Sequence, residues 1–259
     1  MHALSPEQFA SFRVNGFLTI ENVLTDDEVD ALAERADLIA AGRAEHVPEK
    51  CIQLEQRFRK CEQEITDQVM AVRKLYMLAV HDEVMWQHAT NPKIVDIIAD
   101  LLGTDDIKLY NDQLFMKAPG TGTANSWHQD SQSWCDIFPM DLVSAWTAID
   151  DATLDNGCLN FAVGTHQWGM LTKAATRSLV EELNDGTWPV RAAPLKRGSV
   201  SFHHSLTLHR SGANTSAKRR RGYATHYMRA TSVKDESVIR TVKVPPFKQV
   251  RGRSFPGRV

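Results

Sequence analysis

The sequence predicts a mixed α and β protein, mainly β, in which helices come first and strands follow. Up to residue 102 the chain carries helix-start signals and apolar residues at helical spacing. From Ile107 onward it changes to short apolar or aromatic runs bounded by Gly, Pro or Asp, which is typical of strands. With 259 residues and no repeat or evident linker, we expect one domain over residues 1–259, with a helical N-terminal part (1–106) and a strand-rich core (107–259).

The helix signals are local and specific. Ser5-Pro6 has the N-cap and first-turn preferences of a helix, which Gly16 would end. Thr25–Glu28 is a capping box in front of an amphipathic run. Residues 81–102 have the pattern of two helices, separated at Asn91-Pro92 because proline disfavours helix in the residue before it.

The strand signals are β-branched, aromatic and other apolar runs. One strand is expected early, at residues 17–20, and residues 170–185 have a helical pattern that interrupts the later series. Many strands preceded by helices indicate a strand core with helical additions. The expected later strands are Ile107–Lys117, Leu142–Ile149, Cys158–Val163, Ser199–Phe202 and Gly222–Met228.

Composition excludes several classes of protein. The net charge of −2 gives no global basic field for nucleic acid, and the one basic block, Lys218–Arg221, is mostly explained as a solvated turn. No apolar run reaches the roughly 18 residues of a membrane span, and we expect no membrane partner and no signal peptide. The four cysteines show no CxxC pattern, which favours a reducing compartment, the cytoplasm.

His128, Asp130 and His209 have the composition of a metal site. Two imidazoles and one carboxylate are the usual ligands of non-haem Fe(II) with open coordination positions. On a strand, residues i and i+2 point to the same face, so His128 and Asp130 are expected to converge. One His-x-Asp match is weak by itself, because a hydrogen-bonded strand histidine would look the same.

Ser211 and Arg220 strengthen the pattern. Ser211 shares a strand face with His209. Arg220 follows a turn signal at residues 211–216, and a hairpin there would return it next to His209. On the following strand Arg220 and His226 would share one face, and Arg221 the other. Ser211 and Arg220 together could hold a second, dicarboxylic ligand beside the metal.

Further motifs accompany this constellation along nearly the whole chain. They are Phe12–Leu18, Val23–Val29, Gln113–Lys117, Ala145–Ala148, Asn156–Leu159, Gly164–His166, Leu208–Ser216 and His226-Tyr227. With them, the chain resembles the phytanoyl-CoA dioxygenase family of Fe(II)/2-oxoglutarate-dependent oxygenases. The resemblance implies a double-stranded β-helix (jelly roll) core buttressed by N-terminal helices.

The resemblance also implies residue roles. The cofactors are Fe(II), with 2-oxoglutarate and O2 as co-substrates. The iron ligands are His128, Asp130 and His209. Residues implied on the 2-oxoglutarate side are Arg220, Ser211, Trp146, Lys74 and Gln113.

The expected function is oxidation, foremost hydroxylation, of a small organic molecule coupled to decarboxylation of 2-oxoglutarate to succinate and CO2. A metal-dependent hydrolase or cupin-type isomerase is the alternative, since the same ligands hold Zn(II) or Mn(II), but hydrolysis has no use for Arg220 and Ser211. A catalytically silent jelly-roll binding protein is a third reading. The sequence does not identify the substrate or the oligomeric state, nor separate hydroxylation from desaturation, epoxidation or cyclisation.

The substrate hypothesis rests on the polar segment 43–72. A long charged segment is either a mobile lid or a plain exposed loop with some helix. Arg57, Arg59 and Lys60 lie together in it and favour an anionic substrate, bound between this segment and Trp134. The alternative is that these cations are solvated and pair with neighbouring glutamates.

Overall fold

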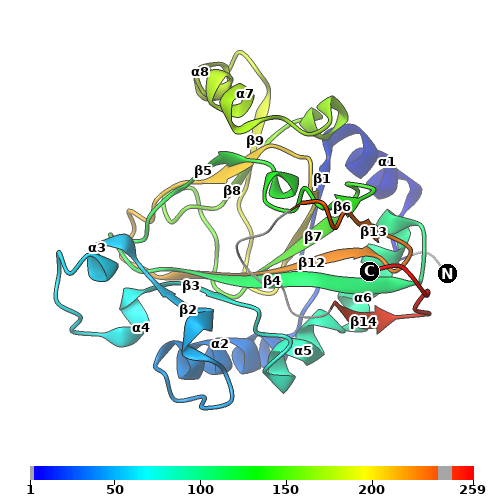
Figure 1. Ribbon diagram of the computed structural model, residues 1–259. Coiled ribbons are helices and arrows are strands. Elements are labelled where there is room, and N and C mark those ends of the chain that lie inside the picture. Colours follow the sequence, from blue (N-terminus) through cyan, green and yellow to red (C-terminus); the bar gives the residue numbers. More distant parts are fainter. Residues whose placement is uncertain (1–2, 239–246) are drawn as a thin grey trace.

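Two antiparallel sheets make up the jelly roll in the computed structural model, which describes residues 3–238 and 247–259 (Figure 1). The larger sheet has eight strands, with β14 (Lys248–Arg251) paired to β4 beside the main path. The order of that path is β1 (Phe17–Ile20), β10 (Val200–His204), β7 (Val143–Ala148), β12 (Arg220–Arg229), β4 (Ile107–Lys117), β3 (Val72–Tyr76) and β2 (Ile52–Leu54).

The smaller sheet carries two of the predicted metal ligands. Its order is β5 (Asn125–His128), β11 (His209–Ser211), β8 (Leu159–Ala162) and β9 (Val190–Ala193). A separate two-stranded pair joins β6 (Ile137–Phe138) to β13 (Val233–Lys234).

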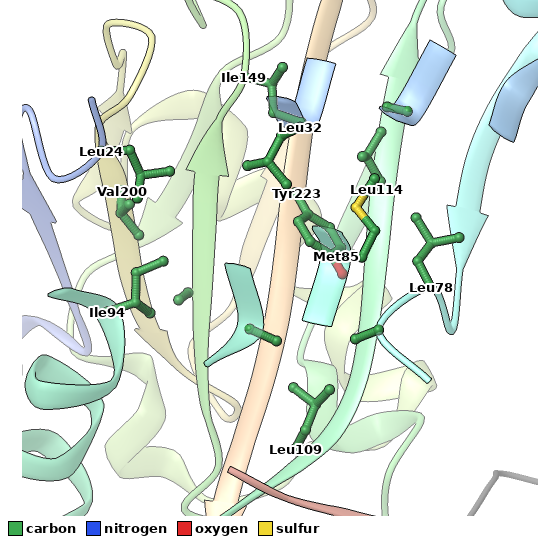
Figure 2. Packing of buried hydrophobic residues seen from close by; sticks show 14 of the residues in the cluster. Leu24, Leu32, Leu78, Met85, Ile94, Leu109, Leu114, Ile149, Val200 and Tyr223 are labelled. Carbon is green, nitrogen blue, oxygen red and sulfur yellow. The ribbon is translucent and has the colours of Figure 1, made fainter. Parts of the chain in front are cut away.

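Helices from the first part of the chain pack on the larger sheet. These are α1 (Pro6–Asn15), α2 (Asp26–Ala40), α5 (Glu83–Ala89) and α6 (Pro92–Leu102). Figure 2 shows Leu32 of α2 and Met85 of α5 close to Leu114 and Tyr223 of the sheet, and all four side chains are buried. This core occupies one face of the sheet and leaves the other to the candidate site.

Shorter helices lie at two ends of the molecule. In Figure 1, α3 and α4 lie beyond the edge strand β2 and its neighbour β3, whereas α7 and α8 lie next to β5, β8 and β9. The bounds are α3 (Gln56–Arg59), α4 (Gln68–Ala71), α7 (Lys173–Ser178) and α8 (Val180–Asp185). The 3-10 helices are Glu49–Cys51, Asp130–Gln132 and Thr165–Trp168. Within the described residues, no helix combines the length and apolar character needed to cross a bilayer.

Most predicted elements are confirmed. The predicted capping box forms at Thr25, Ser5 caps the first helix and also completes a capping box with Gln8, and Asn91 caps a second helix after the break. Segment 43–72 differs from the expectation of a surface excursion, because β2 lies inside it and pairs with β3 in the larger sheet. The first 106 residues thus supply three strands of that sheet as well as helices.

The predicted hairpin between Ser211 and Arg220 is wrong. β11 belongs to the smaller sheet and β12 to the larger one, so the connection crosses from one sheet to the other. Arg220 instead pairs with Lys117 of β4. It still reaches the vicinity of His209, because both residues line one cavity.

Candidate metal centre and co-substrate pocket

A cavity of about 560 Å³ is lined by strands of both sheets and by α7. The three predicted metal ligands His128, Asp130 and His209 all line it. One ligand atom from each lies within 4.8 Å of the other two. Nε2 of His128 is 3.8 Å from Oδ1 of Asp130, and Nε2 of His209 is 3.9 Å from the same oxygen.

The strand pairing explains how residues so far apart in sequence meet. His128 and His209 are direct partners across β5 and β11. The prediction that Asp130 lies on the same strand as His128 is wrong, since β5 ends at His128 and Asp130 begins a 3-10 helix. The turn, rather than the two-residue strand period, brings this carboxylate beside the two imidazoles.

Backbone carbonyls orient both imidazole rings. Nδ1 of His128 lies 2.8 Å from the carbonyl of Ser126, and Nδ1 of His209 lies 3.0 Å from that of Thr207. A carbonyl only accepts, so each Nδ1 must carry the hydrogen and donate it. Nε2 of each ring then carries the free lone pair that a metal ligand requires.

Asp130 is oriented in the same way. Its Oδ2 accepts from the Ser144 hydroxyl at 2.9 Å and lies 3.2 Å from Nε2 of His203, while Oδ1 faces the two imidazoles. Burial would raise the pKa of this carboxyl, but His209 and the bond from His203 outweigh it and hold the pKa well below its usual value. The charged carboxylate and two neutral imidazole nitrogens fit a divalent iron.

Arg220 lies at the buried end of the cavity without a carboxylate partner among the described residues. The side chain is 1% exposed, and Nη2 donates to the carbonyl of Gly157 at 2.6 Å. Its guanidinium stacks over Trp146 at 5.3 Å, and Nε has no partner in the described part of the chain. Burial lowers its pKa to about 10, so the group stays charged at neutral pH and has donors to offer an anion.

Lys117 is a site residue that the sequence reasoning missed. Its Nζ donates to Oγ of Ser211 at 2.9 Å and to the carbonyl of Gly212. Because Nζ of Lys117 donates to this oxygen, the hydroxyl hydrogen of Ser211 is free to donate to a ligand. The available signal was the strand period, which puts Gln113 and Lys117 on one face.

The other predicted co-substrate residues also lie together. Lys74 donates to Gln113 at 2.9 Å, and both line the cavity with Trp146 and Ser211. The Trp146 ring occupies the space above Gly222, where an added Cβ would come within 1.9 Å of the indole. All five residues that the resemblance implies on the 2-oxoglutarate side therefore line the same cavity.

The predicted substrate residues divide into two groups. Trp134 lines the cavity, with its ring 4.4 Å from that of His226. Arg57 and Arg59 do not line it, and Arg57 lies over the ring of Phe58 instead. Of residues 43–72, all of which the structure describes, Gln53 alone belongs to the lining.

Helix α7 forms the wall of the cavity that the sequence predicts from segment 43–72. Lys173, Thr176 and Arg177 of α7 line the cavity at the spacing of one helix face, and Val180 lines it from the start of α8. The side chain of Gln132, two residues after Asp130, donates to Oγ1 of Thr176 at 2.7 Å. The helix is thereby joined to the turn that carries a predicted metal ligand.

Comparison with known proteins identifies relatives of this chain and its fold. A 27% identical relative, "Probable phytanoyl-CoA dioxygenase" of Caenorhabditis elegans, aligns over 86% of this chain and 75% of its own length. "Methylphosphonate hydroxylase" of Gimesia maris is 28% identical over 84% of this chain and 78% of its own. The crystal structure of EctD from S. alaskensis superposes with a TM-score of 0.75 at 23% identity, covering 91% and 80% of the two chains, which establishes the fold.

The family model described as "Phytanoyl-CoA dioxygenase (PhyH)" matches residues 12–222. That match spans α2, α5, α6, the three candidate ligands, Lys117 and Arg220. The chain belongs to the phytanoyl-CoA dioxygenase family of Fe(II)- and 2-oxoglutarate-dependent oxygenases.

Proposed function

We propose that this chain hydroxylates a small organic molecule, using Fe(II), O2 and 2-oxoglutarate, and that it releases succinate and CO2. The observation that carries the proposal is one cavity with two features. At one place His128, Asp130 and His209 present free ligand atoms, and at its buried end Arg220 and Ser211 present donors to a carboxylate. A dicarboxylate bound there would reach the metal with its other end.

Each residue has a separate task in this proposal. Iron held by the triad would supply the activation of O2 and the oxidising power. Ser144 and His203 keep Oδ1 of Asp130 directed at the metal. Arg220 and Ser211 hold the distal carboxylate, and the stacked Trp146 shields it from water.

The alternatives are weaker on specific grounds. A hydrolase or cupin-type isomerase would use the triad but not the cationic end of the cavity. Desaturation, epoxidation and cyclisation would use the same residues as hydroxylation. The relative named as a methylphosphonate hydroxylase favours hydroxylation. We place the protein in the cytoplasm, as its unpatterned cysteines predict.

The proposal is tested by loading the protein anaerobically with Fe(II) and 2-oxoglutarate and then adding O2. Succinate should form in proportion to added iron even without the primary substrate, at a slow uncoupled rate. Zn(II) in place of Fe(II) should give none. Iron-independent turnover, or no binding of 2-oxoglutarate at all, would contradict the proposal.

The affinity for 2-oxoglutarate should fall as the pH rises above about 6. Burial, and then the nearby Arg220 and Arg73, lowers the pKa of Lys117 to about 6, so this amine is mostly neutral at pH 8 in the free pocket. A carboxylate bound beside Ser211 would raise that pKa, and binding would then take up a proton. Between the pKa of Lys117 in the free pocket and its higher pKa in the complex, the Kd for 2-oxoglutarate should increase by up to about tenfold per pH unit.

Anaerobic titration calorimetry between pH 6 and pH 8.5 measures this effect, and buffers of different ionisation enthalpy count the protons. Lys117→Met is the matched variant, since it keeps much of the side-chain volume without the amine. Its Kd should vary less with pH. A wild-type Kd that is constant over this range would remove Lys117 from the explanation.

Gly222→Ala should displace Trp146 and weaken 2-oxoglutarate binding. The new methyl group would overlap the indole, and such overpacking costs about 1–3 kcal/mol of stability. We expect a lower Tm together with a higher Kd for 2-oxoglutarate. Adding Trp146→Phe, which removes part of the overlapping ring, should recover Tm in a double-mutant cycle. Independent, additive effects of the two changes would contradict this packing argument.

A further inference from the structure

Cations from three separate elements line the cavity. Lys173 and Arg177 project from α7 and are exposed, Arg73 comes from β3, and Arg210 comes from β11. Asp130 is the one Asp or Glu in the cavity lining, and its charge is already engaged by the histidines. The lining therefore carries an excess of positive charge.

Neutral groups, rather than carboxylates, contact these cations. Arg73 donates to Oδ1 of Asn125 at 2.7 Å, and Arg210 donates to Oδ1 of Asn184 at 2.5 Å. Among residues 3–238 and 247–259, none of the four cations forms an ion pair with Asp or Glu. Several other arginines of the described surface do have a carboxylate partner, as Arg197 has Asp30 at 2.6 Å. Within the same described residues, the cations of the cavity lining have none and are available to an anionic ligand.

Arg73 lies near the buried end of the cavity, because its partner Asn125 pairs with Ser211 across β5 and β11. The other three, Lys173, Arg177 and Arg210, are the cations at the mouth. Arg220 at the buried end is 1% exposed, whereas Lys173 and Arg177 are open to solvent. A bound 2-oxoglutarate would compensate the buried group and leave the mouth uncompensated. Like charges gathered without a partner favour binding of an anion, which arginine grips through paired N–H donors.

We propose that Lys173, Arg177 and Arg210 form the binding site for an anionic group of the primary substrate, a small carboxylic or phosphonic acid. The acid group would lie at the mouth, and the carbon to be oxidised would point to the triad. This inference rests on the proposed function, since it assigns the second ligand of the same cavity. It also moves the cations that contact the substrate from segment 43–72 to α7, whose Lys173 and Arg177 line the cavity.

The test is binding, without turnover, to protein loaded anaerobically with Fe(II) and saturating 2-oxoglutarate. Saturation keeps small anions away from Arg220. The probes are butyrate and phenylacetate, each compared with its primary amide, and methylphosphonate, compared with methanesulfonamide. Quenching of tryptophan fluorescence is a suitable signal, because Trp127 and Trp134 line the cavity. Wild type should bind at least one acid about tenfold or more tightly than its neutral partner, and the chemical class that does so distinguishes carboxylate from phosphonate.

The variants Lys173→Gln and Arg177→Gln remove charge from exposed positions and are expected to fold normally. Each should weaken acid binding about three- to tenfold, and the double variant more, with little change for the amide. Arg191→Gln on β9 is the matched control, an exposed arginine outside the cavity lining, and it should bind as wild type does.

Two results would overturn the inference: no acid preferred over its neutral partner in wild type, or the preference retained in the Lys173→Gln/Arg177→Gln double variant. Neither result would touch the proposed function, which is read separately from iron-dependent succinate formation in the same preparations. Loss of succinate formation in wild type would instead mean that the proposed function has failed.

Discussion

Asp130→Ala should abolish iron-dependent succinate formation, with a loss of well over 100-fold. The change removes the one anionic ligand of the candidate triad and leaves two imidazoles to hold the metal. Loss of a residue that merely orients a ligand already costs about 10–100-fold in metal affinity or activity, and loss of the ligand itself should cost more. Bound iron and succinate should fall together.

Ser144→Ala provides the graded comparison. It keeps the carboxylate but removes the hydroxyl that holds Oδ2, so the expected loss is within the 10–100-fold range. Circular dichroism and Tm should show that both variants remain folded. If Asp130→Ala retained full activity with added Fe(II), the assignment of the triad would be wrong.

Local signals in the sequence account for much of the fold. Capping boxes and proline at a helix start act within a few residues, so α1, α2 and α6 could be placed from sequence. The long strands β4 and β12 bury most of their length and carry a strong apolar pattern. The sheet to which each strand belongs is decided by contacts between distant segments, and the predicted hairpin failed for that reason.

Short edge strands were missed for a related reason. β2 has only three residues, all half-buried, and lies in a mostly polar segment. It is too short for an alternation of apolar and polar side chains to be recognised in the sequence. Its pairing with β3 makes it a strand. The same polar segment suggested a lid over the site, but the side of the fold that a surface segment covers is a tertiary property. Helix α7, which the sequence placed within residues 170–185, covers the site instead.

The candidate site was predictable where residue type alone indicated chemistry. The two histidines, Asp130 and Arg220 were found in that way and line one cavity. Ser144 and Lys117 were not, because a serine or a lysine on a strand has no distinctive pattern. Their roles depend on atoms within hydrogen-bond distance of Asp130 and Ser211, which only the register of the sheets brings together.

Arg220→Lys and Arg220→Ala should raise the Kd for 2-oxoglutarate about tenfold or more with little change in bound iron. A charge-assisted bond of this kind contributes roughly 1.5–3 kcal/mol, which corresponds to about 10–150-fold in affinity. Lysine restores the charge but lacks the planar pair of donors, so Arg220→Lys should recover only part of the loss. Anaerobic calorimetry on the iron-loaded protein measures both quantities.

The neighbouring arginines are matched controls, because they lie on the opposite face of the sheet. Arg219 pairs with Asp37 at 2.7 Å, and Arg221 pairs with Asp150 at 2.7 Å and with Asp37 at 3.3 Å. Arg221→Ala should lower Tm, since it leaves the partly buried Asp150 without its partner, and should leave the 2-oxoglutarate Kd nearly unchanged. Should Arg221→Ala weaken 2-oxoglutarate binding as strongly as Arg220→Ala does, the buried end of the cavity would not be the carboxylate site.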